Sequence, residues 1–125
     1  MKPRDTALRL KRFEANEKAR KVVSIEAMIN DFEHMAADLA RQIAAEEERT
    51  GIKDATHFAY STFAKAAQQR RQNLLVSVED LRVQLETARR EHEEVAIEVK
   101  KLEPIEGRDS AALHRKGDRN RAVLG

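Results

Sequence analysis

Hydrophobic residues recur every three or four positions along two long stretches of the chain, residues 9–49 and residues 63–102. This spacing is typical of α-helices with one apolar face, and its persistence over several heptads indicates a coiled coil. A short break at residues 50–56, which includes Gly51, separates the two stretches. Because a single helix of this length would leave its apolar face in water, we expect the second helix to fold back on the first. The predicted fold is all-α, with two long helices that form an antiparallel coiled-coil hairpin.

The contact seam between the two predicted helices can be followed by residue number. In the first helix, steps of three and four residues alternate through Val22, Ile25, Ile29, Phe32, Ala36, Leu39 and Ile43, with Met28 and Met35 beside them. Toward the amino terminus the same register gives Leu8, Lys11, Ala15 and Lys18. In the second helix, the predicted seam residues are Tyr60, Phe63, Ala67, Arg70, Leu74, Val78, Leu81, Leu85, Ala88, His92, Val95, Val99 and Leu102. Two consecutive steps of four, around Leu74, predict a stutter that locally unwinds the coil.

The predicted boundaries are a first helix over about residues 5–50, a loop over about 51–59 and a second helix over about 60–103. Forty helical residues, at about 1.5 Å of rise each, would form a rod of roughly 60–65 Å. Charged residues make up 37% of the chain and aromatic residues 4%, which favours a narrow seam over a globular core. We therefore expect one elongated domain over residues 1–103. Residues 104–125 are basic and lack an apolar period, which predicts a disordered tail.

The ends of the predicted helices carry residues that commonly terminate helices. Gly51 suits the left-handed backbone position that follows a helix. Asp54, Thr56 and Ser61 are alternative caps for the second helix, and the sequence does not choose between them.

Charge is distributed in blocks, although the net charge is only +2. Residues 1–21 hold eight basic and three acidic residues, whereas residues 22–50 hold two basic and seven acidic residues. In an antiparallel hairpin, the acidic block would lie beside Lys65, Arg70, Arg71 and Arg82. The basic block would lie beside Glu91, Glu93, Glu94, Glu98 and Glu103. Such flanking charges set the orientation of a coiled coil more than its stability.

The composition gives little support for catalysis. The chain has no cysteine, and His34, His57, His92 and His114 are not spaced to share a metal ion. It has no glycine-rich phosphate loop and no nucleophile motif. We therefore expect neither an enzyme nor a cofactor nor a small-molecule substrate. No stretch reaches the ~20 apolar residues of a membrane span, and the start lacks the apolar core of a signal peptide, so a cytoplasmic protein is expected.

Three of the five aromatic residues, Phe58, Tyr60 and Phe63, lie within six positions at the predicted bend. The rings either fill the open end of the two-helix seam or form an exposed contact surface. Both interpretations hold together if Phe63 faces inward and Phe58 or Tyr60 faces outward.

A second candidate is the basic run of residues 9–21, in which Leu10 and Phe13 lie off the seam and Lys11 and Lys18 lie on it. Charged runs of this kind are most often solvated helix ends. The functional alternative is a basic helix with apolar anchors that binds an acidic protein groove. Nucleic acid is a weaker candidate, because no aromatic platform and no folded DNA-binding unit accompany the charge.

Several short segments resemble the flagellar export protein FliJ family. They are Arg-Leu-Lys-Arg-Phe at residues 9–13, Glu17-Lys18, His-Phe-Ala-Tyr-Ser-Thr-Phe-Ala at residues 57–64, and Gln-Gln-Arg-Arg-Gln-Asn-Leu at residues 68–74. The pair Tyr60 and Phe63 is the most specific fragment. The resemblance extends over residues 1–103, and nothing is carried over for residues 104–125.

The resemblance implies an antiparallel coiled coil similar in shape to the central stalk of rotary ATPases. It implies a soluble component of the flagellar type III protein export apparatus, needed for flagellum assembly and motility, that escorts substrate chaperones. The expected partners are the hexameric export ATPase, contacted by Arg9, Lys11, Arg12 and Phe13, and the cytoplasmic part of the membrane export gate. The expected gate-side residues are Phe58, Tyr60, Phe63, Ala67, Arg70 and Leu74. The alternatives are a nucleic-acid-associated coiled coil and a dimeric structural scaffold.

Overall fold

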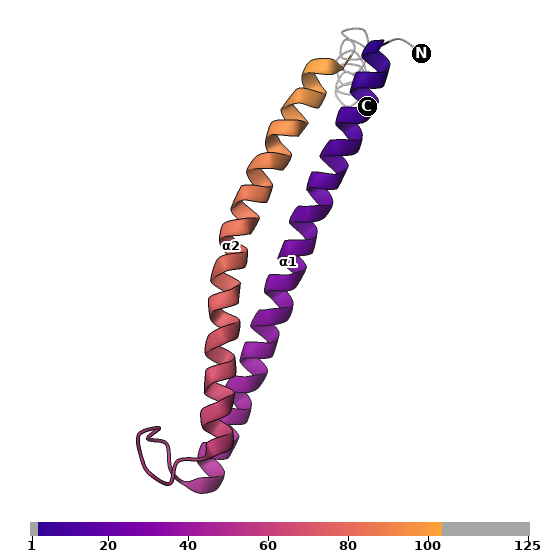
Figure 1. Cartoon of the computed structure of the whole chain (residues 1–125). Helices are drawn as coiled ribbons and strands as arrows, with labels where there is room; N and C mark the ends of the chain where they lie inside the picture. The colour runs from indigo at the N-terminus through magenta and orange to yellow at the C-terminus, as the bar shows by residue number, and fades with distance from the viewer. Residues whose placement is uncertain (1–2, 104–125) are drawn as a thin grey trace, which may run out of the picture. The chain divides into compact units, whose positions relative to one another are not determined.

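The computed structural model describes residues 3–103, which form two helices and no strand. Helix α1 spans Pro3–Thr50 and helix α2 spans Thr62–Leu102, and α2 runs back along α1 after the loop (Figure 1). The predicted all-α antiparallel hairpin is confirmed. Helix α2 begins two residues later than predicted, so the loop covers residues 51–61. The predicted tail, residues 104–125, lies outside the described residues.

The contacts divide the chain into two compact units. Among the described residues, the first unit combines residues 3–18 with residues 91–103, and the second is Ala19–Arg90. Each unit therefore contains a stretch of α1 and a stretch of α2.

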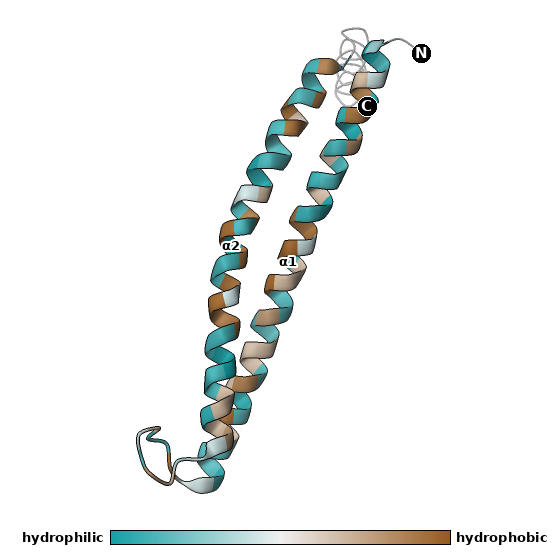
Figure 2. Cartoon of the chain, in the orientation of Figure 1, coloured by the Kyte–Doolittle hydropathy of each residue, from teal (hydrophilic) through white to brown (hydrophobic). Residues whose placement is uncertain are grey.

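The second unit buries the predicted seam of α1 against α2. Hydrophobic residues recur along both helices in Figure 2, as the sequence pattern predicts. One buried cluster contains Ile25, Ile29, Val78, Leu81, Leu85 and Ala88, with Val22 and Phe32 packed against it. Another contains Leu39, Ile43 and Ala67, with Leu74 packed against it. The alternating three- and four-residue steps of α1 are confirmed across this unit.

The predicted seam is wrong at the start of α2. Phe63 is 55% exposed, whereas the next residue, Ala64, is fully buried at 0%. Arg70 is also exposed. The buried and half-buried residues Ala64, Ala67, Leu74 and Val78 instead keep a regular heptad spacing, in which the exposed Arg71 takes the position between Ala67 and Leu74, so the predicted stutter is absent. The physical reason is the helical register, because Ala64 lies three residues before Ala67 and two heptads before Val78 and so shares their buried face, whereas Phe63 does not.

The first unit has a thinner hydrophobic seam that ion pairs extend. Leu8 of α1 and Val95 of α2 are buried. The next seam positions of α1 after Leu8 include two lysines, Lys11 and Lys18. Lys11 Nζ lies 2.6 Å from Glu98 Oε2, and Lys18 Nζ lies 3.1 Å from Glu91 Oε2. Half-buried lysines can cover apolar surface with their stems while the ammonium reaches a carboxylate. The expected pairing of the basic block with the acidic end of α2 is confirmed for these two lysines.

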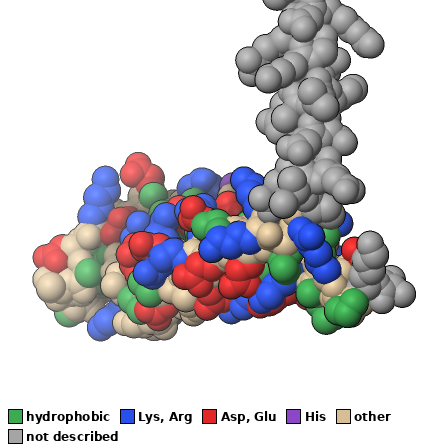
Figure 3. All heavy atoms as spheres, turned by 90° about the horizontal axis from the view of Figure 1, so that it is seen from above, with side chains coloured by type: hydrophobic (Ala, Val, Ile, Leu, Met, Phe, Trp, Pro, Cys, Tyr) green, Lys and Arg blue, Asp and Glu red, His purple; other side chains and the backbone are tan. Residues whose placement is uncertain are grey.

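Ion pairs also line one flank of the second unit. Arg82 Nη2 lies 3.2 Å from Glu33 Oε1, and Arg89 Nη2 lies 3.6 Å from Glu26 Oε2. A step of seven residues forward in α1 is matched by a step of seven backward in α2, as an antiparallel register requires. Figure 3 shows the charged side chains of both signs interspersed on the surface it presents. Each exposed pair contributes about 0–1 kcal/mol to stability.

The acidic block does not pair with α2 as fully as the sequence predicts. Of the four cations expected beside it, only Arg82 forms such a pair. Lys65, Arg70 and Arg71 form no ion pair with any carboxylate of residues 3–103. Within the acidic block itself, Asp38 pairs with Arg41, and Glu46 pairs with Arg49. Carboxylates that are paired one turn away on α1 are less available to α2.

Local hydrogen bonds define both ends of the loop. Gly51 has a φ of 75°, and its N–H donates to the Glu47 carbonyl at 2.9 Å, which confirms the predicted left-handed end of α1. Of the three alternative caps for α2, Ser61 performs this role, because its Oγ accepts the Ala64 N–H at 3.2 Å. Asp54 instead closes a turn inside the loop and accepts the Thr56 N–H at 2.9 Å.

The corrected seam predicts that Ala64→Leu destabilises the chain, whereas Ala66→Leu does not. Ala64 is fully buried and Ala66 is exposed. Overpacking a filled position costs about 1–3 kcal/mol, whereas the exposed substitution is expected to stay within about 0.5 kcal/mol. Urea unfolding followed by circular dichroism at the helical band measures both. Equal unfolding midpoints for the two variants would contradict the corrected seam.

Candidate partner-binding surfaces

Tyr60 joins the loop to both helices at the bend. Its side chain is 8% exposed, and its hydroxyl lies 2.9 Å from Glu47 Oε2 of α1. The same hydroxyl accepts a hydrogen bond from Gln68 Nε2 of α2 at 2.9 Å. Beside it, the Ser61 hydroxyl donates to Glu46 Oε1 at 3.1 Å. These three side-chain hydrogen bonds fix the loop against the ends of α1 and α2.

The bend shifts the pKa values of two of these groups in defined directions. Burial raises the pKa of Tyr60, and the hydrogen bond to the Glu47 carboxylate raises it further. The Arg49 side chain lowers the pKa of Glu46 by hydrogen bonding to its carboxylate. In the loop, the hydrogen bonds from Thr56 lower the pKa of Asp54. These shifts follow from the hydrogen bonds that hold the bend together, so they do not indicate catalysis.

The other two rings of the aromatic cluster are exposed. Phe58 is 97% exposed, and its ring stacks on His57 with centroids 4.6 Å apart. Phe63 is 55% exposed. The prediction that Phe63 faces inward is therefore wrong, and Tyr60 takes the inward position from the loop. We refer to the two exposed phenylalanines, Phe58 and Phe63, together as the aromatic surface.

The remaining predicted gate-side residues are divided between interior and surface. Ala67 is buried in the seam, and Leu74 is half-buried beside it. Arg70 is exposed on α2. Of the six predicted residues, the structure therefore presents Phe58, Phe63 and Arg70 at the surface.

The predicted ATPase-side residues lie mostly at the surface of the first unit. Arg9 and Arg12 are exposed, and Phe13 is 64% exposed. Leu10, one turn from Phe13 and 65% exposed, joins them. Lys11 differs, because its ion pairs with Glu98 and Glu14 direct it to the seam and raise its pKa. We call Arg9, Leu10, Arg12 and Phe13 the basic surface.

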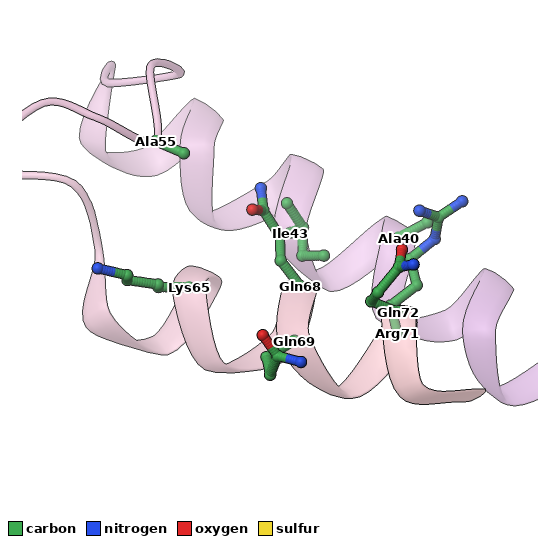
Figure 4. Close-up of a pocket in the computed structure, with 8 residues that line it drawn as sticks. All are labelled: Ala40, Ile43, Ala55, Lys65, Gln68, Gln69, Arg71 and Gln72. Carbon is green, nitrogen blue, oxygen red and sulfur yellow. The ribbon is translucent and has the colours of Figure 1, made fainter. Parts of the chain in front are cut away.

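A groove of about 530 Å³ opens between α1, α2 and the loop in the second unit. Figure 4 shows Ala40 and Ile43 on α1 and Ala55 on the loop, with the longer polar side chains on α2. Its lining residues are Ala40, Ile43, Ala55, Lys65, Gln68, Gln69, Arg71 and Gln72. The sequence pattern did not identify this groove, because it placed Phe63 and Arg70 on the seam, whereas Lys65, Gln68 and Arg71 of α2 line the groove.

Exposed hydrophobic residues on the outer side of α2 were also missed. Val76 and Val83 are 52% and 69% exposed. The two valines are seven residues apart, and each precedes a seam residue, Val78 or Leu85, by two positions. This spacing could have identified them as a second apolar pair away from the seam.

The described residues contain no group of three or more histidine, aspartate or glutamate side chains placed to hold a metal ion. Neither α1 nor α2 is long and apolar enough to cross a membrane. Within residues 3–103, every buried side-chain nitrogen or oxygen atom has a hydrogen-bond partner.

The chain matches no family model, no curated protein and no solved structure with which it was compared.

The environment of Tyr60 predicts that its phenol titrates above its ordinary pKa of 10.0 in the native chain. Tyr60 is the only tyrosine and the chain has no tryptophan, so absorbance at the phenolate band reports on this residue alone. Because the folded pKa is the higher one, the neutral phenol stabilises the fold below pH 10.0. This stabilisation is lost as the pH rises through the folded pKa. We expect Glu47→Gln to lower the native pKa, because the substitution removes the neighbouring carboxylate. Equal titration curves for the native and urea-unfolded chains would contradict the described bend.

Proposed function

We propose that this chain is a non-enzymatic coupling protein of the flagellar type III export apparatus, which bridges the export ATPase and the cytoplasmic part of the membrane export gate. The observation that carries the proposal is the exposure of large apolar side chains on two separate surfaces, one in each unit. Leu10 and Phe13 belong to the basic surface, and Phe58 and Phe63 form the aromatic surface. None of these four side chains contributes to the buried seam.

The basic surface is complementary to an acidic surface of a protein partner. Arg9 and Arg12 are exposed cations next to exposed apolar residues, and neither cation has a carboxylate partner in residues 3–103. Arginine and aromatic side chains are enriched where protein interfaces concentrate their binding energy. Proteins with complementary charges associate quickly, and exposed charged contacts of this kind remain reversible. A protein that couples two parts of an export apparatus requires both properties.

The aromatic surface lies at a bend that is held by hydrogen bonds. Tyr60, anchored to Glu47 and Gln68, fixes the loop that carries Phe58. An exposed ring on a fixed backbone loses little conformational freedom when a partner covers it. We propose Phe58, Phe63 and Arg70 as the gate-contacting residues, because Tyr60 and Ala67 are buried and Leu74 is half-buried.

The identity of the partners rests on the family resemblance of residues 9–13 and 57–74. Under this proposal, the protein is cytoplasmic and reaches the inner membrane only through its partners, and it also escorts substrate chaperones. The nucleic-acid alternative is less favoured, because Glu98 and Glu91 pair with Lys11 and Lys18 and so reduce the cations available to phosphates. A dimeric scaffold is the remaining alternative, and sedimentation would distinguish it as twice the 14.3 kDa mass.

The proposal predicts that Arg9→Glu combined with Arg12→Glu weakens binding to the flagellar export ATPase by about tenfold or more, because both cations face the partner. Pull-down with purified ATPase at moderate salt measures the loss. The matched control is Lys53→Glu combined with Arg90→Glu, which changes the net charge equally at exposed positions elsewhere. Equal retention of the ATPase by both double variants would contradict the assignment of the basic surface.

The aromatic surface is tested separately with the cytoplasmic part of the export gate. We expect Phe58→Ala combined with Phe63→Ala to weaken gate binding by about tenfold, because two exposed rings are removed while the seam is unchanged. The exposed Val83→Ala variant is the control for loss of a surface apolar group. Isothermal titration measures affinity, and circular dichroism checks helicity. Unchanged gate affinity at unchanged helicity would overturn the aromatic surface as the contact.

A further inference from the structure

We propose that the groove at the start of α2 binds an acidic, apolar-bearing protein segment of a partner. The groove is the one of about 530 Å³ between α1, α2 and the loop, and we call it the cationic groove. Binding at this groove would be independent of the identity of the ATPase and of the gate.

The lining of the groove carries positive charge and no negative charge. Lys65 and Arg71 are its two ionisable residues, and both are cations. Three glutamines add amide donors and acceptors, and no carboxylate belongs to the lining. Over the whole stretch from residue 62 to residue 78, α2 carries Lys65, Arg70 and Arg71 and no acidic residue. A ligand that carries carboxylates is the chemical complement of this surface.

Arg71 is the residue that sets the groove apart from the rest of the seam. By its spacing from Ala67 and Leu74, Arg71 falls where a coiled coil normally places an apolar seam residue, but its side chain is exposed. The two lysines on seam positions of α1, Lys11 and Lys18, each reach a glutamate of α2. Arg71, by contrast, meets no carboxylate of residues 3–103. A charged residue where the heptad spacing expects an apolar one, with no ion-pair partner in the described chain, adds nothing evident to the stability of the fold. Such positions are often functional.

The packing around Arg71 explains why the space exists. Ala64 and Ala67 are small and buried, and Arg71 is exposed, so the seam positions of α2 supply little side-chain volume opposite α1. Ala40 and Ile43 of α1 therefore contribute an apolar wall (Figure 4). The groove thus combines an apolar contact with cations and amides, which suits a peptide segment with both acidic and apolar side chains.

A protein segment fits this groove better than the other ligand classes. The groove is open to solvent along its length and does not enclose a small molecule as binding pockets do. No aromatic side chain lines it, so it offers no stacking platform for nucleic-acid bases. Gln68 and Gln69 each donate one amide hydrogen bond within the chain, to Tyr60 and Asn73, and the remaining amide hydrogen and oxygen atoms of the glutamines can pair with groups of a peptide.

The test uses the full chain and a fluorescein-labelled peptide made of glutamate, leucine and alanine with a helical apolar stripe. Fluorescence anisotropy measures its binding at low and moderate salt. We expect saturable binding that weakens as salt increases, and no binding of the same peptide with lysine in place of glutamate. Failure of the acidic peptide to bind the full chain, or equal binding of both peptides, would overturn the proposal.

Two variants locate the binding to the groove. Lys65→Gln combined with Arg71→Gln should weaken the acidic peptide by about tenfold, since each partly exposed ion pair contributes up to about fivefold. Arg90→Gln combined with Lys101→Gln removes the same charge from exposed positions outside the groove and should change the affinity less than twofold. Equal losses in the two double variants would overturn the assignment to the groove.

A third variant blocks the groove without changing its charge. Ala55 is exposed on the loop and lines the groove, so Ala55→Trp should fill part of the space while the seam stays intact. We expect at least a fivefold loss of peptide affinity at unchanged helicity. Undiminished affinity in this variant would contradict binding inside the groove.

Discussion

Burial of one narrow strip of hydrophobic side chains between α1 and α2 is the interaction on which the structure depends. The strip follows the alternating three- and four-residue spacing of both helices, and it gathers Ile25 and Ile29 with Leu81 and Leu85 in the second unit. A two-helix seam covers only one side of each helix. Every side chain off the strip must therefore be solvated, paired with a neighbour or covered by a partner. This constraint turns exposed apolar residues and unpaired cations into informative features.

The pairing of charges separates structural cations from candidate binding residues. Lys11 and Lys18 extend the seam through Glu98 and Glu91, and Arg82 and Arg89 bind glutamates on the flank. The cations at the start of α2 have no such partner among residues 3–103. The same reasoning separates Tyr60, which is buried and hydrogen-bonded at the bend, from Phe58 and Phe63, which are exposed.

Much of this arrangement follows from the sequence, because periodicity reports directly on which helix face is buried. The α1 seam, the end of α1 at Gly51 and the lysine–glutamate pairing were predictable. The start of α2 was not, because hydrophobicity favours Phe63 on the seam, whereas the register of Ala67 and Val78 brings the smaller Ala64 there. Tyr60, the first predicted seam residue of the second helix, is buried as predicted, although it lies in the loop rather than in α2. The charge blocks also do not show that Arg82 has an ion-pair partner and that Arg71 has none among residues 3–103. Which cation is paired depends on the local register of the helices and on ion pairs within α1, such as Glu46 with Arg49.

The central claim is that α1 and α2 of one chain pack antiparallel in this register, and zero-length carbodiimide cross-linking tests it most directly. The chain is mixed with an isotopically heavy copy, reacted, digested and analysed by mass spectrometry. The account predicts isopeptide bonds between Lys11 and Glu98 and between Lys18 and Glu91, whose ion pairs span 2.6 Å and 3.1 Å. Both bonds should join peptides of the same isotope. Cross-links that join light to heavy chains, or that connect α1 to α1 in register, would contradict it.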